Sequence, residues 1–575
     1  MSIDPATAVP LELNDEVRAA LDADVAALAA GIERWAAMPL ARRARLMAQV
    51  HDSVAAQDQA WTDAAVAAKH TPSALAGEEW FSGPYVTMDG FGGVAQSLER
   101  LAAGRSPIEG LRTGTAPGGR ATVSVLPTTA YEQVLLSGFS AEVWLEPGVG
   151  LDQAEREAGL GARDTGVNGG VGVVLGAGNV SGIGPLDVLY ELVAFNRASV
   201  LKLNPTFASL KPVYEAALAP LIEADLLRIV NGAAAVGGYL TGHDGIDHVH
   251  ITGSAITHDA IVWGVGEEAE RRRAAGEPKL TKAITSELGG VSPIIVIPGE
   301  WSEADLRYQA EHVVTQRLHN SGHNCIAGQT LVLSADWPQR DAFLAAIREV
   351  LDTLPARGPW YPGSDAKLAL ATQSYPGAEW HTDNRLLIQV DETTSQDLFS
   401  TEYFTSVLGH TSLPGTGAVF FANAVAFANE RLDGTLGGSI IVAPADRTAM
   451  GGAFDAILAD LRYGTIAINA WSAMGFLLRG APWGAFPGNT LDAAGSGIGV
   501  VHNSYLLPRT ERTIVTGPFR PFPRSVLHGE LSLSPKAPWF VTARTAATTA
   551  QRMTRFVGKP SWVRIPGIVA SAFRG

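Results

Sequence analysis

Short apolar runs alternate with segments of helical character from Gly170 to about residue 300, and this alternation restricts the possible folds more than any other feature of the sequence. A strand, a helix and a second strand in succession are typical of βαβ units, whose strands pair in parallel. Strands are predicted at 171–175, 199–203, 227–230 and 249–252, and helices at 186–196, 210–224 and 234–240. The sequence therefore predicts an α/β fold, an architecture found in nucleotide-binding proteins and in proteins that bind no nucleotide.

The segments on either side of this core have different characters. Residues 11–101 predict helices, because apolar residues recur there at helical spacing. Further strands are predicted as a hairpin-like insertion at 121–126 and 142–146, and as a pair at 284–288 and 294–297 that leads into a second α/β region. The 575 residues exceed what one hydrophobic core holds, so two or three domains are expected.

The composition argues against several classes of protein. Hydrophobic residues make up 46% of the chain and charged residues 18%, as in ordinary soluble enzymes rather than in disordered chains. The formal net charge of −15 argues against general nucleic-acid binding, which requires a basic surface. No run approaches the roughly 18 consecutive apolar residues of a membrane-spanning helix, and the N-terminus shows no signal-peptide pattern. A single cysteine suits a reducing compartment, so we expect a cytoplasmic protein.

The C-terminal segment departs from this acidic average. From Arg520 onward every charged residue is basic except Glu530. A basic tail on an acidic protein is expected to pack on acidic side chains of the body or of a partner subunit, with contact to a membrane surface or an anionic ligand as the alternative.

Cys325 is the only cysteine, so it cannot form an intrachain disulfide or a cysteine-rich metal site. Structural cysteines usually lie in apolar runs, whereas this one is flanked by amide and imidazole side chains and bounded by Gly322 and Gly328. The sulfur is therefore either an inert buried side chain or a nucleophile.

Several separated segments together resemble the aldehyde dehydrogenase superfamily, over roughly residues 35–519. Residues 320–325, Asn-Ser-Gly-His-Asn-Cys, are similar to the nucleophile motif of the family, and residues 287–290, Glu-Leu-Gly-Gly, to its general-base motif. Further similarities occur at Gly176–Asn179, Val200–Lys202, His250–Ser254 and Glu402–Phe404. No one of these strings is specific, and their order along the chain carries the resemblance.

The resemblance implies a Rossmann-like cofactor domain, a catalytic α/β domain and a projecting β-strand oligomerisation arm. It also implies NAD(P)-dependent oxidation of an aldehyde to a carboxylic acid. Cys325 would attack the aldehyde carbonyl, Glu287 would activate water against the resulting thioester, and Asn179 would donate to the oxyanion. The cofactor contacts that the resemblance implies are Lys202, Gly253, Ser254, Glu402 and Phe404.

The expected organisation follows from the same resemblance. The dinucleotide-binding domain would comprise residues 1–120 and 165–282, the catalytic domain 283–490, and the arm with the C-terminal extension 121–164 and 491–575. The insertion and a strand-like run at 513–515 favour a homodimer or homotetramer. The expected partner is a small-molecule aldehyde. Trp471 and Phe476 are expected in the core, with an apolar substrate tunnel as the alternative.

The sequence departs from the family pattern at several positions. His258 replaces a glycine in the helix after Ser254, which adds bulk beside the expected pyrophosphate site. No acidic residue follows Lys202 in the next few positions, so a 2′-phosphate meets no repulsion and both NAD and NADP are allowed. Thr405 and Ser406 stand where glycine and proline are usual. These differences indicate a divergent branch of the superfamily that the sequence resembles.

Other functions remain open at this stage. A CoA-linked acyl reductase would use the same thiol, although the general-base glutamate argues against it. A Cys/His hydrolase or acyltransferase would use His323 or His319 to accept the thiol proton, without any nicotinamide. A binding protein with a degenerate site would bind nucleotide but leave Cys325 unreactive. No metal site is expected, and His248 and His250 on a predicted strand are expected to share one face as ordinary polar residues.

Overall fold

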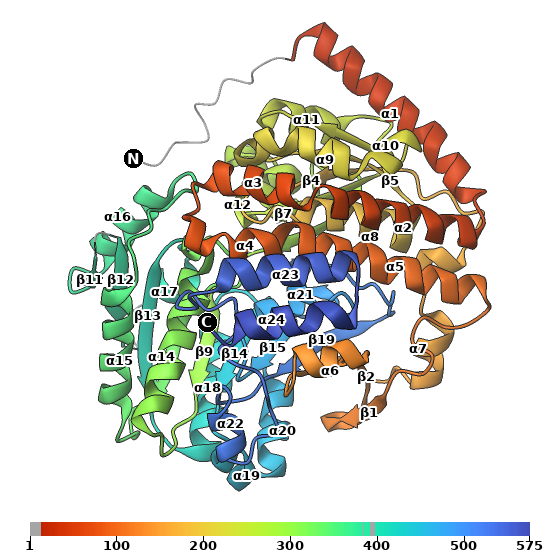
Figure 1. Ribbon diagram of the computed structural model, residues 1–575. Helices are drawn as coiled ribbons and strands as arrows, with labels where there is room; N and C mark the ends of the chain where they lie inside the picture. The colour runs from red at the N-terminus through yellow and green to blue at the C-terminus, as the bar shows by residue number, and fades with distance from the viewer. Residues whose placement is uncertain (1–12, 383, 392–396) are drawn as a thin grey trace.

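The computed structural model describes residues 13–382, 384–391 and 397–575, and it is built around two β-sheets covered by helices (Figure 1). The smaller sheet has six strands in the order β17-β8-β7-β4-β5-β6, and all of them are parallel except β17. The strands are β4 (Val171–Leu175), β5 (Ala198–Lys202), β6 (Leu227–Val230), β7 (His248–Gly253), β8 (Ala283–Leu288) and β17 (Gly497–Ile498).

The predicted βαβ alternation is confirmed by β4 to β7, which lie close to the predicted positions. Most of their residues are buried, as expected for parallel strands covered on both faces. The helix predicted at 210–224 is instead two helices, α9 (Lys211–Ala217) and α10 (Ala219–Glu223). Pro220 lies in the first turn of the second helix, where its missing N–H is tolerated; within a continuous helix that N–H would be needed.

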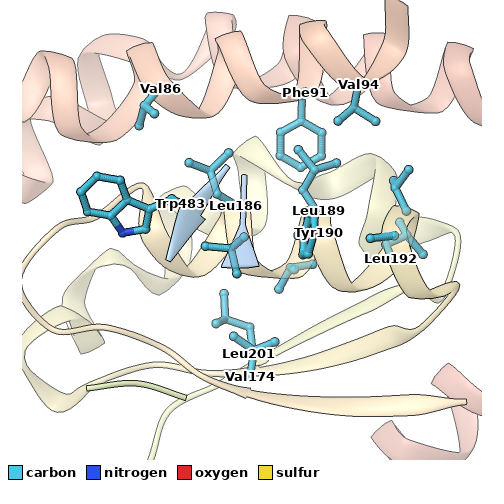
Figure 2. Close-up of a cluster of buried hydrophobic side chains, with 14 of the residues drawn as sticks. Val86, Phe91, Val94, Val174, Leu186, Leu189, Tyr190, Leu192, Leu201 and Trp483 are labelled. Carbon is cyan, nitrogen blue, oxygen red and sulfur yellow. The ribbon is translucent and has the colours of Figure 1, made fainter. Parts of the chain in front are cut away.

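Helix α8 (Ile183–Phe195) is mostly apolar, as expected for a helix that is buried along almost its whole length. Figure 2 shows Leu186 and Leu189 of α8 between Val174 and Leu201 of the sheet on one side and Phe91 of α5 (Val86–Ala102) on the other. This packing fixes the start of α8 and with it the preceding loop, which carries a predicted site residue.

The larger sheet has eleven strands in the order β1-β2-β3-β19-β15-β14-β9-β10-β13-β12-β11. The run from β19 to β12 is parallel, and the strands at both edges are antiparallel. The bounds are β1 (Thr113–Ala116), β2 (Arg120–Leu126), β3 (Ser140–Leu145), β9 (Ser292–Val296), β10 (Gly328–Ser334), β11 (Glu379–His381), β12 (Arg385–Gln389), β13 (Val407–Leu413), β14 (Gly437–Ile441), β15 (Thr465–Ile468) and β19 (Thr510–Thr516).

The predicted hairpin is confirmed as β2 and β3, and the strand-like run at 513–515 lies in β19. β19 pairs with β3 on one side and with β15 on the other. The arm is therefore continuous with the larger sheet of the same chain.

Strands β8 and β9, predicted as a pair, lie in different sheets. Gly289 and Gly290 connect them, so the prediction of a pair was wrong: the two glycines carry the chain from one sheet to the other. The expected boundary between the dinucleotide-binding domain and the catalytic domain lies between residues 282 and 283. β8 follows this boundary and still pairs with β7, so the six-stranded sheet continues past it. Glu287, near the end of β8, consequently stands close to where the sheets meet.

The prediction of helices in the N-terminal segment is confirmed. Elsewhere, a run rich in charged residues extends from Glu267 to Lys282, and its first part forms the solvent-facing helix α13 (Gly266–Ala275). The N-terminal helices are α1 (Asp15–Ala36), α2 (Leu40–Ala56), α3 (Asp58–Lys69), α4 (Gly77–Trp80) and α5 (Val86–Ala102). Among the described residues, no helix has both the length and the apolar composition needed to cross a bilayer.

The C-terminal extension packs on the body of the same chain. Its helices α23 (Ala546–Gly558) and α24 (Ile565–Ala572) lie across the front of the molecule in Figure 1. Arg520 and Arg524 both form ion pairs with Asp305, and Lys536 lies 2.7 Å from Glu311. Both acids belong to α14 (Glu303–Leu318). Part of the basic tail is thus neutralised by acids of its own chain.

Candidate active site

A cavity of about 810 Å³ opens at the carboxyl ends of β4, β5 and β7. The chain runs from β4 outward to β5 and β6 and then returns to β7 on the other side of β4, so the sheet reverses its order between β4 and β7. Ligands of open parallel sheets bind in the crevice at such a point. All of the predicted site residues line this cavity: Asn179, Lys202, Gly253, Ser254, Glu287, Cys325, Glu402 and Phe404.

Cys325 follows a strained turn, η7 (His319–Gly322), in which Asn320 has a φ of 56°. A left-handed backbone at a residue other than glycine needs surrounding contacts that hold it. The backbone N–H of Asn320 donates to Glu78 Oε2 at 3.1 Å, and its Nδ2 donates to the carbonyl of His323 at 3.0 Å. These bonds fix the turn and hold Cys325 at the cavity wall.

The half-buried thiol of Cys325 lies near the carboxyl group of Glu287, close enough for each group to shift the pKa of the other. Burial, together with the negative charges of Glu287 and Glu402, holds the pKa of the thiol well above its ordinary value. Burial also raises the pKa of Glu287 to about 7, while the nearby thiol of Cys325 acts in the opposite direction. At neutral pH the site therefore holds a thiol beside a carboxyl group whose pKa suits it to accept and release a proton.

Glu402 packs directly on the glycine connection between the sheets. A Cβ at Gly289 would lie 2.0 Å from Glu402 Oε1, so a side chain there would displace the carboxyl group. Burial raises the pKa of Glu402 to about 8, and Arg317 opposes part of this rise. The Oε1 atom of Glu402 is buried without a hydrogen-bond partner. Such an atom on a cavity-lining residue is available to a ligand hydroxyl.

Asn179 lies in the loop between β4 and α8 and is 7% exposed. Its Nδ2 donates to the carbonyl of His323 at 3.0 Å. Because an amide carries two N–H donors, the second remains available to an acceptor in the cavity.

The histidines near the thiol have other roles. His323 Nδ1 lies 2.6 Å from the carbonyl of Phe404 and must donate to it, since a carbonyl only accepts. Burial lowers the pKa of His323 to about 3. The ring of His319 packs edge-on against Trp471, and burial lowers its pKa. The side chains that shift the pKa of Cys325 are carboxyl groups and not imidazoles, which argues against the Cys/His alternative.

The opposite part of the cavity carries groups suited to a dinucleotide. Burial lowers the pKa of Lys202 at the end of β5. Ser254 caps α12 (Ala255–Val262), and its Oγ accepts from the backbone N–H of Thr257 at 3.2 Å. The free N–H groups at a helix start favour anions. The side chain of His258 is fully buried and does not line the cavity, so the bulk expected beside the pyrophosphate site lies in the core instead.

A second cavity, of about 70 Å³, meets the first at Cys325. Its remaining wall is mostly apolar and aromatic, and it includes Trp471 and Phe476, for which a tunnel was the alternative expectation. The thiol therefore stands between a large cavity with polar groups and a small apolar one.

A buried polar layer borders Glu287. His248 and His250 do share one face of β7, but both are buried and paired with carboxylates of α8 rather than being ordinary polar residues. His250 Nε2 lies 3.4 Å from Asp187 Oδ2. Asp187 in turn contributes to the raised pKa of Glu287. Among the residues described, no group of three or more His, Cys, Asp or Glu is arranged to hold a metal ion.

The sequence did not predict a second charged cluster. It lies behind η7 (His319–Gly322), the turn before Cys325, which is called the nucleophile turn below. Lys69 Nζ lies 2.9 Å from Glu79 Oε2, with both side chains almost fully buried, and it also donates to Asn320 Oδ1 at 3.4 Å. Arg357 pairs with Glu78 at 2.7 Å. Charged residues are expected at the surface from sequence alone, and no local pattern pairs side chains so far apart.

Replacing Lys69 by methionine is expected to lower the free energy of unfolding by about 3–5 kcal/mol, because it leaves Glu79 buried without its partner. The matched control is Lys211→Met, which removes an exposed ion pair with Glu215 and is expected to cost at most about 1 kcal/mol. Denaturant unfolding of both variants measures the difference. Equally small losses would contradict a structural role for the buried pair.

Comparison with known proteins agrees with this geometry. Residues 199–367, which include Lys202, Glu287 and Cys325, match the model of the aldehyde dehydrogenase family. The chain also has the fold of an aldehyde dehydrogenase of Pseudomonas syringae in complex with NAD+ and octanal, with a TM-score of 0.58, 16% identity, and coverage of 88% of this chain and 90% of that chain. Residues 199–367 therefore carry the sequence pattern of the aldehyde dehydrogenase family, and the chain has the fold of the aldehyde dehydrogenases.

Two further proteins match the chain, one over most of its length and one over a short segment. The NADP-dependent glyceraldehyde-3-phosphate dehydrogenase of Bacillus halodurans, complexed with NADP, matches with a TM-score of 0.58 and 20% identity over 87% of this chain and 91% of that chain. An N-succinylglutamate 5-semialdehyde dehydrogenase of Sphingopyxis alaskensis is 31% identical over 133 residues, or 23% of this chain. That match spans only 24% of the relative's length.

Proposed function

We propose that the protein oxidises an aldehyde to a carboxylic acid, with NAD or NADP as the hydride acceptor and Cys325 as the nucleophile. One observation carries this proposal: a thiol and a carboxyl group of raised pKa line the same large cavity, and the thiol stands where that cavity meets a small apolar one. The names of the relatives, among them a semialdehyde dehydrogenase and enzymes bound to NAD+ or NADP, support the same reaction class.

The large cavity fits a dinucleotide. Its volume of about 810 Å³ falls in the range of ~300–1,000 Å³ typical of ligand sites. The N-terminus of α12 at Gly253 and Ser254 would hold the pyrophosphate, and Lys202 and the unpaired Glu402 Oε1 would bind ribose hydroxyls. Phe404 lines the same wall. When bound, NAD(P) supplies the acceptor for the hydride that leaves the substrate carbon.

The protein side chains account for the remaining steps. Glu287 accepts the thiol proton as the sulfur of Cys325 bonds to the aldehyde carbon, and the second amide N–H of Asn179 and the backbone N–H of Cys325 stabilise the oxyanion. Loss of hydride restores the carbonyl as a thioester on Cys325. Glu287 releases the first proton to solvent and then removes a proton from water as the water attacks the thioester. The acid leaves and the thiol regains its proton.

The assembly and compartment are part of the proposal. The exposed β1 forms one edge of the larger sheet, and an open edge beside the arm supports a homodimer or homotetramer. The single thiol supports a reducing, cytoplasmic setting.

The decisive test is a panel of aldehydes assayed with NAD and with NADP separately, without CoA. We expect NAD(P)H and the free acid in equal amounts. Product formation that requires CoA would favour the acyl reductase, and ester turnover without nicotinamide would favour the hydrolase.

A further inference from the structure

Trp539 of the C-terminal extension forms part of the walls of two cavities. One is the small cavity at Cys325. The other, of about 290 Å³, lies among α6 (Ala130–Leu135), α23, α24 and residues 533–539. Its wall is largely apolar and includes Val134, Phe139, Met553, Ile568 and Phe573. The indole thus stands between the reactive sulfur and a larger apolar space.

The backbone around Trp539 is fixed to α14, the helix that leads into the nucleophile turn. The ring of the next residue, Phe540, stacks on Tyr308 and on His312, with centroid distances of 5.3 and 5.4 Å. Further contacts with α14 are Lys536 to Glu311 at 2.7 Å, Thr542 to Glu311 at 2.7 Å, and Val541 to Thr315 at 3.2 Å. The position of the indole relative to Cys325 is therefore set by a rigid helix rather than by a free tail.

The indole itself has little room to move. Trp539 is 9% exposed, and its ring packs edge-on against Phe139 at a centroid distance of 6.0 Å. A large side chain held by ring contacts and anchored by its neighbours acts as a wall.

We propose that Trp539 limits the length of the aldehyde that the enzyme accepts. The substrate class is a short or compact apolar aldehyde, whose tail fills the small cavity and stops at the indole. This inference rests on the proposed function. Removing the indole would join the two cavities, and the added volume of about 290 Å³ is about twice that of an apolar cavity of ~150 Å³ that binds benzene.

The first experiment compares kcat/KM for butanal and decanal in the native protein, Trp539→Ala and Trp539→Leu. We expect the native protein to prefer butanal, and the decanal-to-butanal ratio to rise at least about tenfold in Trp539→Ala and by less in Trp539→Leu, in line with the ~10-fold or greater effect of one methylene in an apolar pocket. The matched control is Phe573→Ala, which alters the larger cavity alone and should leave the ratio unchanged.

A second readout does not need oxidation. Cys325 loses its thiol proton to solvent and displaces iodide from 1-iodobutane or 1-iododecane, and mass spectrometry detects the resulting carbon–sulfur bond. We expect the native protein to react faster with the short reagent, and Trp539→Ala to gain reactivity toward the long one by at least about tenfold.

The outcomes separate the two proposals. Equal use of butanal and decanal by the native protein, or an unchanged ratio in both Trp539 variants that still oxidise butanal, would overturn the length limit. If labelling follows the expected pattern but no variant oxidises any aldehyde, the length limit set by Trp539 is supported and the proposed oxidation is contradicted.

Discussion

Replacing Cys325 by alanine is expected to reduce aldehyde-dependent NAD(P)H formation by at least about 10⁴-fold, because no other group in the site can form the thiohemiacetal from which hydride leaves. Initial rates with a saturating aldehyde measure the loss. Dinucleotide binding should remain, since the groups proposed to hold the cofactor lie on β5, α12 and the segment around Glu402.

The same variant separates the enzyme from its alternatives. Calorimetric titration with NAD and NADP provides the control for folding, because an intact cavity keeps its affinity. Turnover within tenfold of the native rate would mean that hydride leaves a species not bonded to sulfur, and the covalent mechanism would be wrong.

Glu287→Gln is expected to lower steady-state turnover by about 10²–10⁴-fold while retaining a first burst of NAD(P)H. Glutamine has nearly the same shape but cannot accept a proton, so acylation slows but completes, whereas water attack on the thioester stalls. Stopped-flow absorbance resolves the two phases. A steady-state rate equal to that of the native protein, with no burst, would remove Glu287 from the role of base.

The pH dependence follows from the raised pKa of Glu287. Below about pH 7 its carboxyl group is protonated and cannot act as a base, so native turnover should rise as pH increases through about 7. Glu287→Gln should lose this rise. The matched control is Glu402→Gln, since Glu402 is also a buried carboxyl group, with a pKa of about 8. We expect this control to raise the KM for NAD(P). Its turnover should still rise as pH increases through about 7.

Local patterns predicted the βαβ core, and the family resemblance named residues that line one cavity. Strands such as β4 are short apolar runs bounded by glycine, so their positions follow from burial alone. The motif residues converge on one cavity because the ends of parallel strands meet at one edge of the sheet.

Features that depend on contacts between distant segments were not predictable. Nothing local to Gly289 shows that it carries the chain between sheets or that Glu402 packs on it. Lys69 and Glu79 are a buried pair only because α3 and α4 fold behind the nucleophile turn. Trp539 lies more than two hundred residues beyond Cys325, and only the tertiary fold brings it to the small cavity.

The most direct test of the account is the intact mass of Glu287→Gln after reaction with one aldehyde and NAD(P). We predict one added acyl group per chain, located on the peptide that contains Cys325, together with one equivalent of NAD(P)H. Formation of NAD(P)H with no acyl group on that peptide would contradict it.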